Sequence, residues 1–410
     1  RIARRQRQMC IRDRLYRESL SRRLDKGVHF IVDVVYDRIH NNMAEIIGLF
    51  LNTLSILFSQ LVQFRYFLYK HKLLKDKPLG CLVVVVGNLT VGGTGKTPVV
   101  EMLSRQLQQH GRKVAIISRG YKSKKESVFS KFVRYFTHAE KSPPKIVSDG
   151  SQVLLNSEIA GDEPFMLASN LPGVVVICDK DRVKAGYYAI KDYKCDTLVL
   201  DDGYQYLKLR GSLNICLIDT TNPFGNERLL PRGILREPLN RLSKADYILF
   251  TKTSSVAQCS ELYDTVKKYN EHAKIIYSQH ASKYFKRVDK DEEEPLSMLN
   301  ITKVAVFSGI AYPESFEQTI EELGGIITYN KRFLDHHRFS KVEIEQVYQE
   351  AFESGARILV TTEKDAVRLP SKKVRIPLYY LRLEIKILSG EENFKTLAER
   401  ICLPLKSDML

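Results

Sequence analysis

The sequence predicts an α/β fold with a mostly parallel sheet, helices on both faces, a second and smaller α/β domain, and an N-terminal amphipathic helix. Three observations support this prediction. Short apolar, β-branched runs alternate with helical stretches from residue 81 onward, which is typical of buried parallel strands. The first run leads into a glycine-rich loop, and a charged run at 289–295 divides two groups of elements. A charge-free apolar stretch, residues 46–64, precedes them all.

Composition and charge limit the possible functions. The chain has 410 residues, 44% hydrophobic and 27% charged, which indicates a globular protein of two or three domains. Its net charge is +16, and residues 1–77 hold 16 Lys and Arg against 7 Asp and Glu. This excess favours an anionic partner: nucleic acid, a membrane surface or a phosphorylated substrate. Seven cysteines without a C-x-x-C pair indicate reduced thiols of a cytoplasmic protein, with neither a zinc site nor disulfides.

The N-terminal part divides into two segments. Residues 1–43 are expected to be a basic segment, partly artefact or helical. Residues 1–14 are arginine-rich without apolar periodicity, so a gene-model artefact explains them at least as well as a basic arm does. Residues 44–79 form a membrane-associating helix and a basic linker. On a helical projection, polar residues gather within an arc of about 80°, namely Glu45, Asn52, Ser55, Ser59 and Gln63. An in-plane helix on anionic lipid needs such a stripe and a spanning helix does not; the alternative is a helix packed on its own domain.

The next segment, 80–288, is predicted to form the larger domain. Strands are expected at 81–86, 113–117, 174–178, 197–200, 214–218, 246–250 and 274–277. Helices are expected at 97–110, 151–159, 164–170, 182–191 and 258–271. Residues 122–144 are rich in Lys and Ser and are typical of a long lid loop.

The smaller C-terminal α/β domain is predicted at 296–410. Its expected elements are 303–309, 314–323, 326–330, 341–354, 357–362 and 374–381.

The strongest local signal follows the first strand. Val86-Gly87-Asn88-Leu89-Thr90-Val91-Gly92-Gly93-Thr94-Gly95-Lys96-Thr97 is a strand, a glycine-rich loop and a helix start. Such a loop turns backbone N–H groups onto phosphate oxygens, its lysine reaches the β- and γ-phosphates, and its threonine hydroxyl ligates Mg²⁺. Thr90 stands where the strict pattern has glycine, and the adjacent glycines supply flexibility instead. We predict a P-loop NTPase-like phosphate site formed by Thr90, Gly92, Gly93, Thr94, Gly95, Lys96 and Thr97.

A nucleotide site also needs a carboxylate that holds the metal. Asp201 and Asp202 follow a predicted strand and supply two, while Asp179 and Asp219 compete by the same pattern. Three other clusters have chemical potential: Gly161-Asp162-Glu163-Pro164, Leu235-Arg236-Glu237-Pro238 and Asp335-His336-His337-Arg338. None of the three specifies a reaction by itself.

Taken together, these motifs resemble those of the tetraacyldisaccharide 4′-kinases of lipid A synthesis. The resemblance extends over about residues 44–400 and depends on eight short motifs in the family's order. They are 86–98 (VGNLTVGGTGKTP), 118–121 (SRGY), 161–164 (GDEP), 200–205 (LDDGYQ), 230–233 (LPRG), 235–238 (LREP), 335–337 (DHH) and 362–366 (TEKDA).

The resemblance implies Mg²⁺-dependent transfer of the ATP γ-phosphoryl group to the 4′-hydroxyl of an acylated glucosamine disaccharide 1-phosphate, at the cytoplasmic face of the bacterial inner membrane. It also implies that Asp162 takes the hydroxyl proton with support from His336. The two lie in different predicted domains, so closure would assemble the pair. By the same resemblance, Asp201 and Asp202 match the metal-site acids. Residues that match the lining of the site are Asn88, Tyr121, Glu163, Arg182, Gln205, Arg236 and Glu237.

Two positions stay open. The family often has histidine where this chain has Tyr206, and His337 could replace His336 in the pair. No obligate protein partner is evident from the sequence.

The main alternative is a membrane-associated P-loop ATPase switch. Those ATPases carry a lysine directly before the first glycine, and Val91 stands there instead. A GTPase would need an aspartate within 250–254, which reads Phe-Thr-Lys-Thr-Ser. A nucleic-acid-binding protein would fit the net charge, but no such motif is present and much of the charge lies beside the amphipathic helix.

Overall fold

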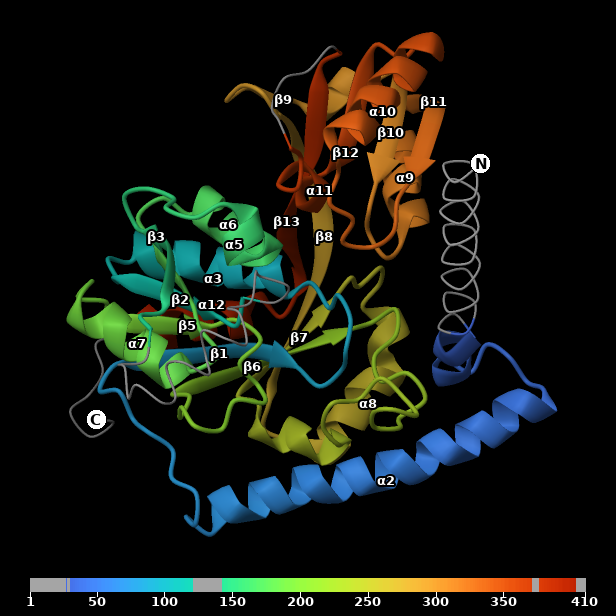
Figure 1. Cartoon of the computed structure of the whole chain (residues 1–410). Helices are drawn as coiled ribbons and strands as arrows, with labels where there is room; N and C mark the ends of the chain where they lie inside the picture. Colours follow the sequence, from blue (N-terminus) through green and yellow to red (C-terminus); the bar gives the residue numbers. More distant parts are fainter. Residues whose placement is uncertain (1–26, 28–29, 121–141, 371–375, 403–410) are drawn as a thin grey trace, which may run out of the picture.

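The computed structural model describes residues 27, 30–120, 142–370 and 376–402. Two α/β units lie one above the other in Figure 1, and a long helix, α2 (Asn42–Lys70), extends beneath the lower unit. Tyr121 and most of the predicted lid loop, 122–144, lie outside the described residues.

The strands form one mostly parallel sheet that passes through both units. The lower unit contains β1 (Leu82–Asn88), β2 (Val114–Ser118), β3 (Lys145–Asp149), β4 (Val175–Cys178), β5 (Thr197–Leu200), β6 (Leu213–Asp219) and β7 (Tyr247–Thr251). The remaining strands are β8 (Lys274–Arg287), β9 (Glu293–Glu294), β10 (Thr302–Ser308), β11 (Gly325–Arg332), β12 (Ile358–Thr362) and β13 (Leu378–Ser389). The order is β11-β10-β12-β13-β8-β7-β6-β1-β5-β2-β4-β3, and β9 pairs with β8.

Helices cover both faces of this sheet. In the lower unit they are α3 (Lys96–Gln109), α5 (Ser157–Ala160), α6 (Asp162–Asn170), α7 (Arg182–Lys191) and α8 (Ser260–Tyr269), with a 3₁₀ helix, η1, at Leu239–Lys244. The upper unit adds α9 (Pro313–Glu322), α10 (Lys341–Glu353) and α11 (Glu363–Ala366), and α12 (Glu391–Cys402) follows β13.

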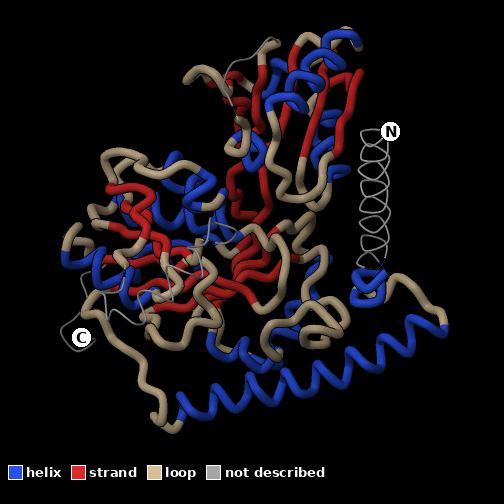
Figure 2. The backbone as a smooth tube through the Cα atoms, viewed as in Figure 1, coloured by secondary structure: helices blue, strands red, loops and turns tan. Residues whose placement is uncertain are grey.

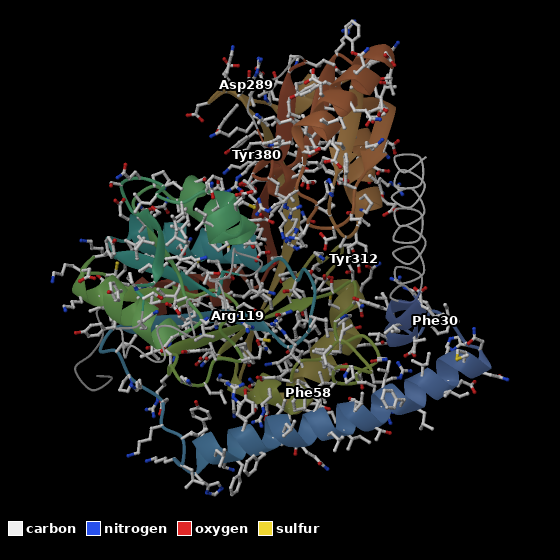
Figure 3. All side chains as sticks on the ribbon, in the orientation of Figure 1. Phe30, Phe58, Arg119, Asp289, Tyr312 and Tyr380 are labelled. Atoms are coloured by element: carbon white, nitrogen blue, oxygen red, sulfur yellow. The ribbon has the colours of Figure 1, made fainter. Side chains whose placement is uncertain are left out.

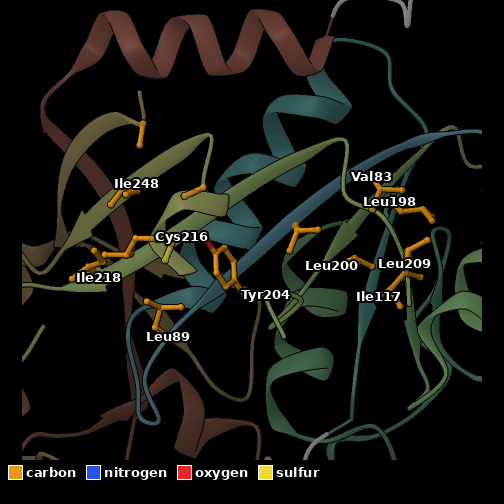
Figure 4. Packing of buried hydrophobic residues seen from close by; sticks show 14 of the residues in the cluster. Val83, Leu89, Ile117, Leu198, Leu200, Tyr204, Leu209, Cys216, Ile218 and Ile248 are labelled. Atoms are coloured by element: carbon orange, nitrogen blue, oxygen red, sulfur yellow. The ribbon is translucent and has the colours of Figure 1, made fainter. Parts of the chain in front are cut away.

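The burial of β1 explains its uninterrupted apolar sequence. All seven of its residues are buried. Successive side chains point to opposite faces of a sheet; accordingly Val83 and Val85 belong to one hydrophobic cluster, and Val84 and Val86 to the other. Figure 4 shows the first cluster, in which the ring of Tyr204 lies among the aliphatic side chains of several strands. The sequence-based prediction of a parallel sheet covered on both faces is confirmed.

Two long antiparallel strands join the units. β8 pairs with β7 at its start and then with β13 along most of its length, while the start of β13 pairs with β12. Figure 2 shows these strands passing from the lower unit into the upper one. α12 then returns to the lower unit, where Leu397 and Ile401 join the core around α3. The predicted boundary at 289–295 stays a prediction, but the segment 296–410 contributes to both units.

The structure differs from the predicted elements at two places before β4. The helix predicted at 151–159 is wrong over most of its length, because Asp149 Oδ1 accepts from the Ser151 and Gln152 N–H groups and turns the chain. Only α5 remains, and it is capped by Asn156. Strand β3 was not predicted; it is antiparallel to β4 at the edge of the sheet.

Helix α2 packs one side on the body and exposes large apolar side chains on the other, although Leu51, Phe58 and Val62 are half-buried. Ala44, Gly48 and Ser55 are buried. The outward face carries large apolar side chains that are more than half exposed, including Ile46, Leu49, Phe50, Leu57, Leu61 and Phe64. Figure 3 shows side chains projecting from α2 both toward the body and away from it. Within the described residues, α2 is the one helix long and apolar enough to cross a membrane by length and composition. The side that carries Ala44, Gly48 and Ser55 is nevertheless covered by the protein.

Candidate active site

The glycine-rich loop connects the carboxyl end of β1 to the amino end of α3. Gly95 caps α3 with a left-handed φ of 78°. Lys96 Nζ donates to Asn88 Oδ1 at 3.2 Å and lies 3.6 Å from Asp202 Oδ1. Thr97 is buried in the first turn of α3. The loop therefore has the strand–loop–helix setting that a phosphate site requires, with its lysine directed toward a strand-end carboxylate.

We expect Gly95→Ala to destabilise the protein even without nucleotide. A Cβ at Gly95 would lie 2.6 Å from Nε2 of His280, whose ring is packed against the loop from β8. The left-handed backbone would cost about 1–2 kcal/mol in addition. Gly93→Ala is the matched control, since nothing lies within 4 Å of a Cβ there. Thermal unfolding of both nucleotide-free variants tests this; equal melting temperatures would contradict it.

Two carboxylates follow β5, at the centre of the sheet, beside β1. Asp202 is bound at both oxygens by the Arg236 guanidinium, each contact 2.9 Å. Asp201 is buried and accepts a hydrogen bond from Ser118 Oγ at 3.1 Å. Burial, together with the neighbouring Glu163 and Asp202 carboxylates, raises the pKa of Asp201. Burial opposes ionisation of Asp202 too, but the Arg236 hydrogen bond and the Lys96 charge outweigh it and lower its pKa.

Other predicted lining residues surround this pair. Arg236 also donates to Asn88 Oδ1, and Gln205 Nε2 donates to the Asn88 carbonyl oxygen at 2.7 Å. The charges of Asp202 and Asp201 act on the buried Arg182, whose pKa is lowered by burial.

Tyr206, whose role the sequence left open, contacts Arg182 in two ways. The Arg182 guanidinium lies over the Tyr206 ring, 5.2 Å from its centroid. The Tyr206 hydroxyl accepts from the Arg182 N–H at 3.1 Å. The ring and the hydroxyl of Tyr206 thus both contact Arg182, the first residue of α7.

Asp162 and His336 meet although they are 174 residues apart and belong to different units. His336 Nδ1 lies 3.3 Å from Asp162 Oδ2. His337 instead lies 3.1 Å from Glu343 Oε1 and stacks on Phe333. In this structure His336 is therefore the histidine that faces Asp162.

Two arginines also bind Asp162: Arg338, which belongs to the predicted cluster 335–338 but had no role assigned, and Arg368, which the sequence did not indicate. Arg368 Nε donates to Oδ2 at 2.8 Å, and Arg338 Nη2 donates to Oδ1 at 3.0 Å. Arg368 has only 1% of its side chain exposed and also donates to Asp365 and to the Gly309 carbonyl oxygen. Arg368 Nη2 lies 3.2 Å from His336 Nδ1, so that nitrogen accepts from Arg368 when unprotonated and donates to Asp162 when protonated.

These contacts set the charge of the two acids at the start of α6. Burial opposes ionisation of Asp162, but the His336 hydrogen bond and the charges of Arg368 and Arg338 outweigh it and lower its pKa. Glu163 is half-buried; partial burial opposes its ionisation, but the ion pair with Lys364 at 3.1 Å and the charge of Lys96 outweigh it and lower its pKa. Asp162 and Glu163 are therefore both ionised at neutral pH, and the positive charge of the P-loop lysine stabilises the ionised form of Glu163.

The oxygen donors suit Mg²⁺, although the described residues contain no ready cluster of three His, Cys, Asp or Glu side chains for a metal. Mg²⁺ is usually held by one or two carboxylates together with substrate phosphates and water. Thr97 and Asp201 supply a hydroxyl and a carboxylate, and a cation there would relieve the repulsion that raises the pKa of Asp201. Both Asp202 oxygens are bound to Arg236.

Of the predicted site residues that the structure describes, almost all lie around the phosphate loop or the contact between Asp162 and His336. Glu237 differs, because its carboxylate points away from the phosphate loop and accepts from Tyr66 of α2 at 2.8 Å. Tyr121 lies outside the described residues.

Comparisons with known proteins agree with this geometry. The family model described as tetraacyldisaccharide-1-P 4′-kinase matches residues 47–402. A tetraacyldisaccharide 4′-kinase of Halothermothrix orenii is 31% identical over 375 residues, 87% of this chain and 94% of the relative. One from Anaeromyxobacter dehalogenans is 37% identical over 329 residues, 79% of this chain and 83% of the relative. The crystal structure of LpxK from Aquifex aeolicus in complex with ATP has 30% identity and a TM-score of 0.68, and covers 86% of this chain and 98% of that one. The chain belongs to the tetraacyldisaccharide-1-P 4′-kinase family.

Proposed function

We propose that this protein is an ATP-dependent 4′-kinase of lipid A synthesis. It transfers the ATP γ-phosphoryl group to the 4′-hydroxyl of an acylated glucosamine disaccharide 1-phosphate. The observation that carries the proposal is the contact between Asp162 and His336 beside the phosphate loop. The loop is near enough that the charge of Lys96 lowers the pKa of Glu163, the residue next to Asp162. A carboxylate in contact with an imidazole is suited to accept the proton of an alcohol, and a P-loop lysine is suited to stabilise phosphate charge.

The reaction divides among groups that the fold holds on different elements. Backbone N–H groups at 92–97 cradle the phosphates, and Lys96 exchanges Asp202 for the β- and γ-phosphates. Mg²⁺ held by Thr97 and Asp201 neutralises phosphate charge when it is bound. The 4′-oxygen attacks the γ-phosphorus, the bond to the β-phosphate oxygen breaks, and ADP leaves.

Asp162 receives the hydroxyl proton in this scheme. Its Oδ1 is bound by Arg338, whose side chain is 39% exposed, while Oδ2 is bound by the buried Arg368. Arg338 is therefore the contact that gives way when the acceptor hydroxyl approaches. A carboxylate with a lowered pKa is a weak base, which suits phosphoryl transfer because the alcohol proton becomes acidic only as the new bond forms.

One incubation tests the proposed reaction. The protein, γ-labelled ATP, Mg²⁺ and the acylated disaccharide 1-phosphate should yield a labelled bisphosphorylated lipid. A membrane-associated ATPase switch would instead release labelled inorganic phosphate at the same rate with and without the lipid.

We propose in addition that α2 lies on the cytoplasmic face of the bacterial inner membrane. One side of α2 is docked on the protein, and the large apolar side chains exposed on the other side are free to enter the lipid interface. The basic linker follows at the same surface and attracts anionic headgroups. The substrate is itself a membrane lipid and would be met at this surface.

Replacing Ile46, Leu57 and Leu61 with Gln should weaken binding to phosphatidylglycerol vesicles by at least about a hundredfold. The three side chains are 67%, 53% and 68% exposed, and burial of each contributes about 1.5–3 kcal/mol when complete, with tenfold in affinity per 1.4 kcal/mol. Val342→Gln with Phe352→Gln is the matched control, since these side chains are 78% and 70% exposed on α10. Vesicle sedimentation measures both; similar losses in the two proteins would count against the membrane-facing side of α2.

A further inference from the structure

A loop at residues 229–237, which we name the bridging loop, lies between α2 and the phosphate loop. On the phosphate-loop side, the Arg236 N–H donates to the Leu89 carbonyl oxygen at 2.7 Å, and the Val91 N–H donates to the Ile234 carbonyl oxygen at 2.8 Å. Thr90 and Leu235 form an antiparallel bridge between these two contacts. The bridging loop is thus paired with residues 89–91, immediately before the glycines.

The other side of the bridging loop is held by α2 at three separated points. Gly48 packs against the Arg232 side chain, and a Cβ there would lie 3.6 Å from Arg232 Nε. The buried Ser55 donates from Oγ to the Leu229 carbonyl oxygen at 2.8 Å. The Tyr66 hydroxyl donates to Glu237 Oε2 at 2.8 Å. These contacts extend over 18 residues of the helix, so they fix its position along the loop rather than at a single point.

Arg236 and Glu237 are adjacent, yet their side chains are bound on different sides. Arg236 makes the two-point contact with Asp202 and also donates to Asn88, inside the phosphate site. Glu237 is 97% buried and is held by α2. A shift of Glu237 would therefore move the backbone from which the Arg236 side chain reaches Asp202.

Tyr66 itself is held on its ring as well as at its hydroxyl. The Arg241 guanidinium lies 3.3 Å from the ring centroid, which fixes the ring from the side of η1. Burial and the Glu237 charge raise the pKa of Tyr66 far above its ordinary value, so its hydroxyl stays protonated and remains a donor. The hydrogen bond to Glu237 thus joins two side chains that have little freedom to find other partners.

We propose that Tyr66 is a positioning residue for phosphoryl transfer: through Glu237 it couples the docking of α2 to the placement of Arg236 at the phosphate site. The inference deepens the proposed kinase function and rests on it. The position of α2, the helix proposed to lie on the lipid surface, would thereby also determine the position of the Arg236 guanidinium in the phosphate site.

Tyr66→Phe tests the inference because it removes only the hydroxyl. We expect kcat to fall by about tenfold, a loss typical of one hydrogen bond to a charged group, while KM for ATP stays within about twofold. Tyr69→Phe, on the same helix three residues later, should keep wild-type kcat, since no hydrogen bond of its hydroxyl is found in the described part of the chain. Glu237→Ala should also lower kcat, and adding Tyr66→Phe to it should cause little further loss.

The outcomes separate this inference from the proposed function. Wild-type kcat in Tyr66→Phe, an equal loss in Tyr69→Phe, or additive losses in the Glu237→Ala pair would overturn the inference. A loss of kcat that is matched by a lower melting temperature and weaker ATP binding would also overturn it, because a merely structural role predicts that pattern. If the wild-type protein forms no bisphosphorylated lipid, the proposed function fails instead.

Discussion

Asp162→Asn should bind ATP with nearly the wild-type Kd and lose about 10²–10⁴-fold in kcat. A positioned base contributes about 10²–10⁴-fold in rate, and an amide cannot take the hydroxyl proton. ATP binding should survive because Asp162 contacts His336, Arg338 and Arg368 rather than the phosphate loop. Single-turnover phosphoryl transfer and equilibrium ATP binding measure the two quantities separately.

The control for this variant is Asp179→Asn. Asp179 follows strand β4 and was a sequence-level competitor for a site acid, but in the structure it forms an ion pair with Lys184. Its replacement should leave kcat unchanged. The melting temperatures of both variants must be measured, since Arg368 is buried and loses a charged partner when Asp162 is replaced, and the assay temperature must lie below both. Turnover retained by Asp162→Asn would remove Asp162 as the base.

The residues of the phosphate site could be predicted because buried strands lead to them: the two acids follow β5 directly, and the glycine-rich loop that ends at Lys96 follows β1. β1 and β5 are buried apolar runs, and the carboxyl ends of parallel strands meet at one edge of a sheet. Lys96, Asp201 and Asp202 follow directly from that rule. Arg368 could not be found in this way, because it follows a short helix in the other unit and reaches Asp162 across the space between units. Its motif neighbourhood, 362–366, supported the family resemblance but indicated no role for an arginine two residues later.

The strands that join the two units, β8 and β13, could not be predicted from the sequence pattern over their full length. The apolar run that predicts β8 stops near residue 277, but the strand continues to Arg287 through Ser278-Gln279-His280 and a stretch of lysines and aromatics. Most side chains there are half-buried, so neither continuous nor alternating hydrophobicity marks the strand. Its pairing with β13 depends on contacts more than 90 residues apart in the chain.

For α2 the periodicity predicted two faces, but the docked side matches the predicted polar arc only in part: Ser55 is buried, whereas Glu45 and Gln63 are exposed. The membrane interpretation and the packed-helix interpretation both describe part of the structure. Ser55 and Tyr66 pack against the bridging loop, whereas Leu49 and Leu61 remain exposed. A serine buried against a carbonyl oxygen is indistinguishable in sequence from a serine facing water, so only the tertiary contact reveals the docked side.

Lys96→Ala should lower kcat by about 10²–10³-fold and raise KM for ATP, because one preorganised charge is lost where negative charge develops on the phosphates. In the nucleotide-free structure Lys96 contacts Asn88 and Asp202, which Arg236 also binds, so the site keeps its remaining geometry when Lys96 is removed. The loss should therefore appear in transfer rather than in folding. Lys286→Ala removes one positive charge from an ion pair with Asp291, outside the site, and is the matched control.

Lys96→Ala and Asp162→Asn should impair the reaction in different ways, and this difference tests the roles assigned to the two residues. Lys96→Ala weakens nucleotide binding as well as transfer, whereas Asp162→Asn affects transfer alone. The double variant should lose less in kcat than the product of the two single fold-losses, because the effects of residues that act in one transition state are not additive. If Lys96→Ala kept kcat within about tenfold of wild type, the phosphate loop could not supply the electrostatic stabilisation that the mechanism requires. If the losses multiplied, the base and the lysine would act in separate steps.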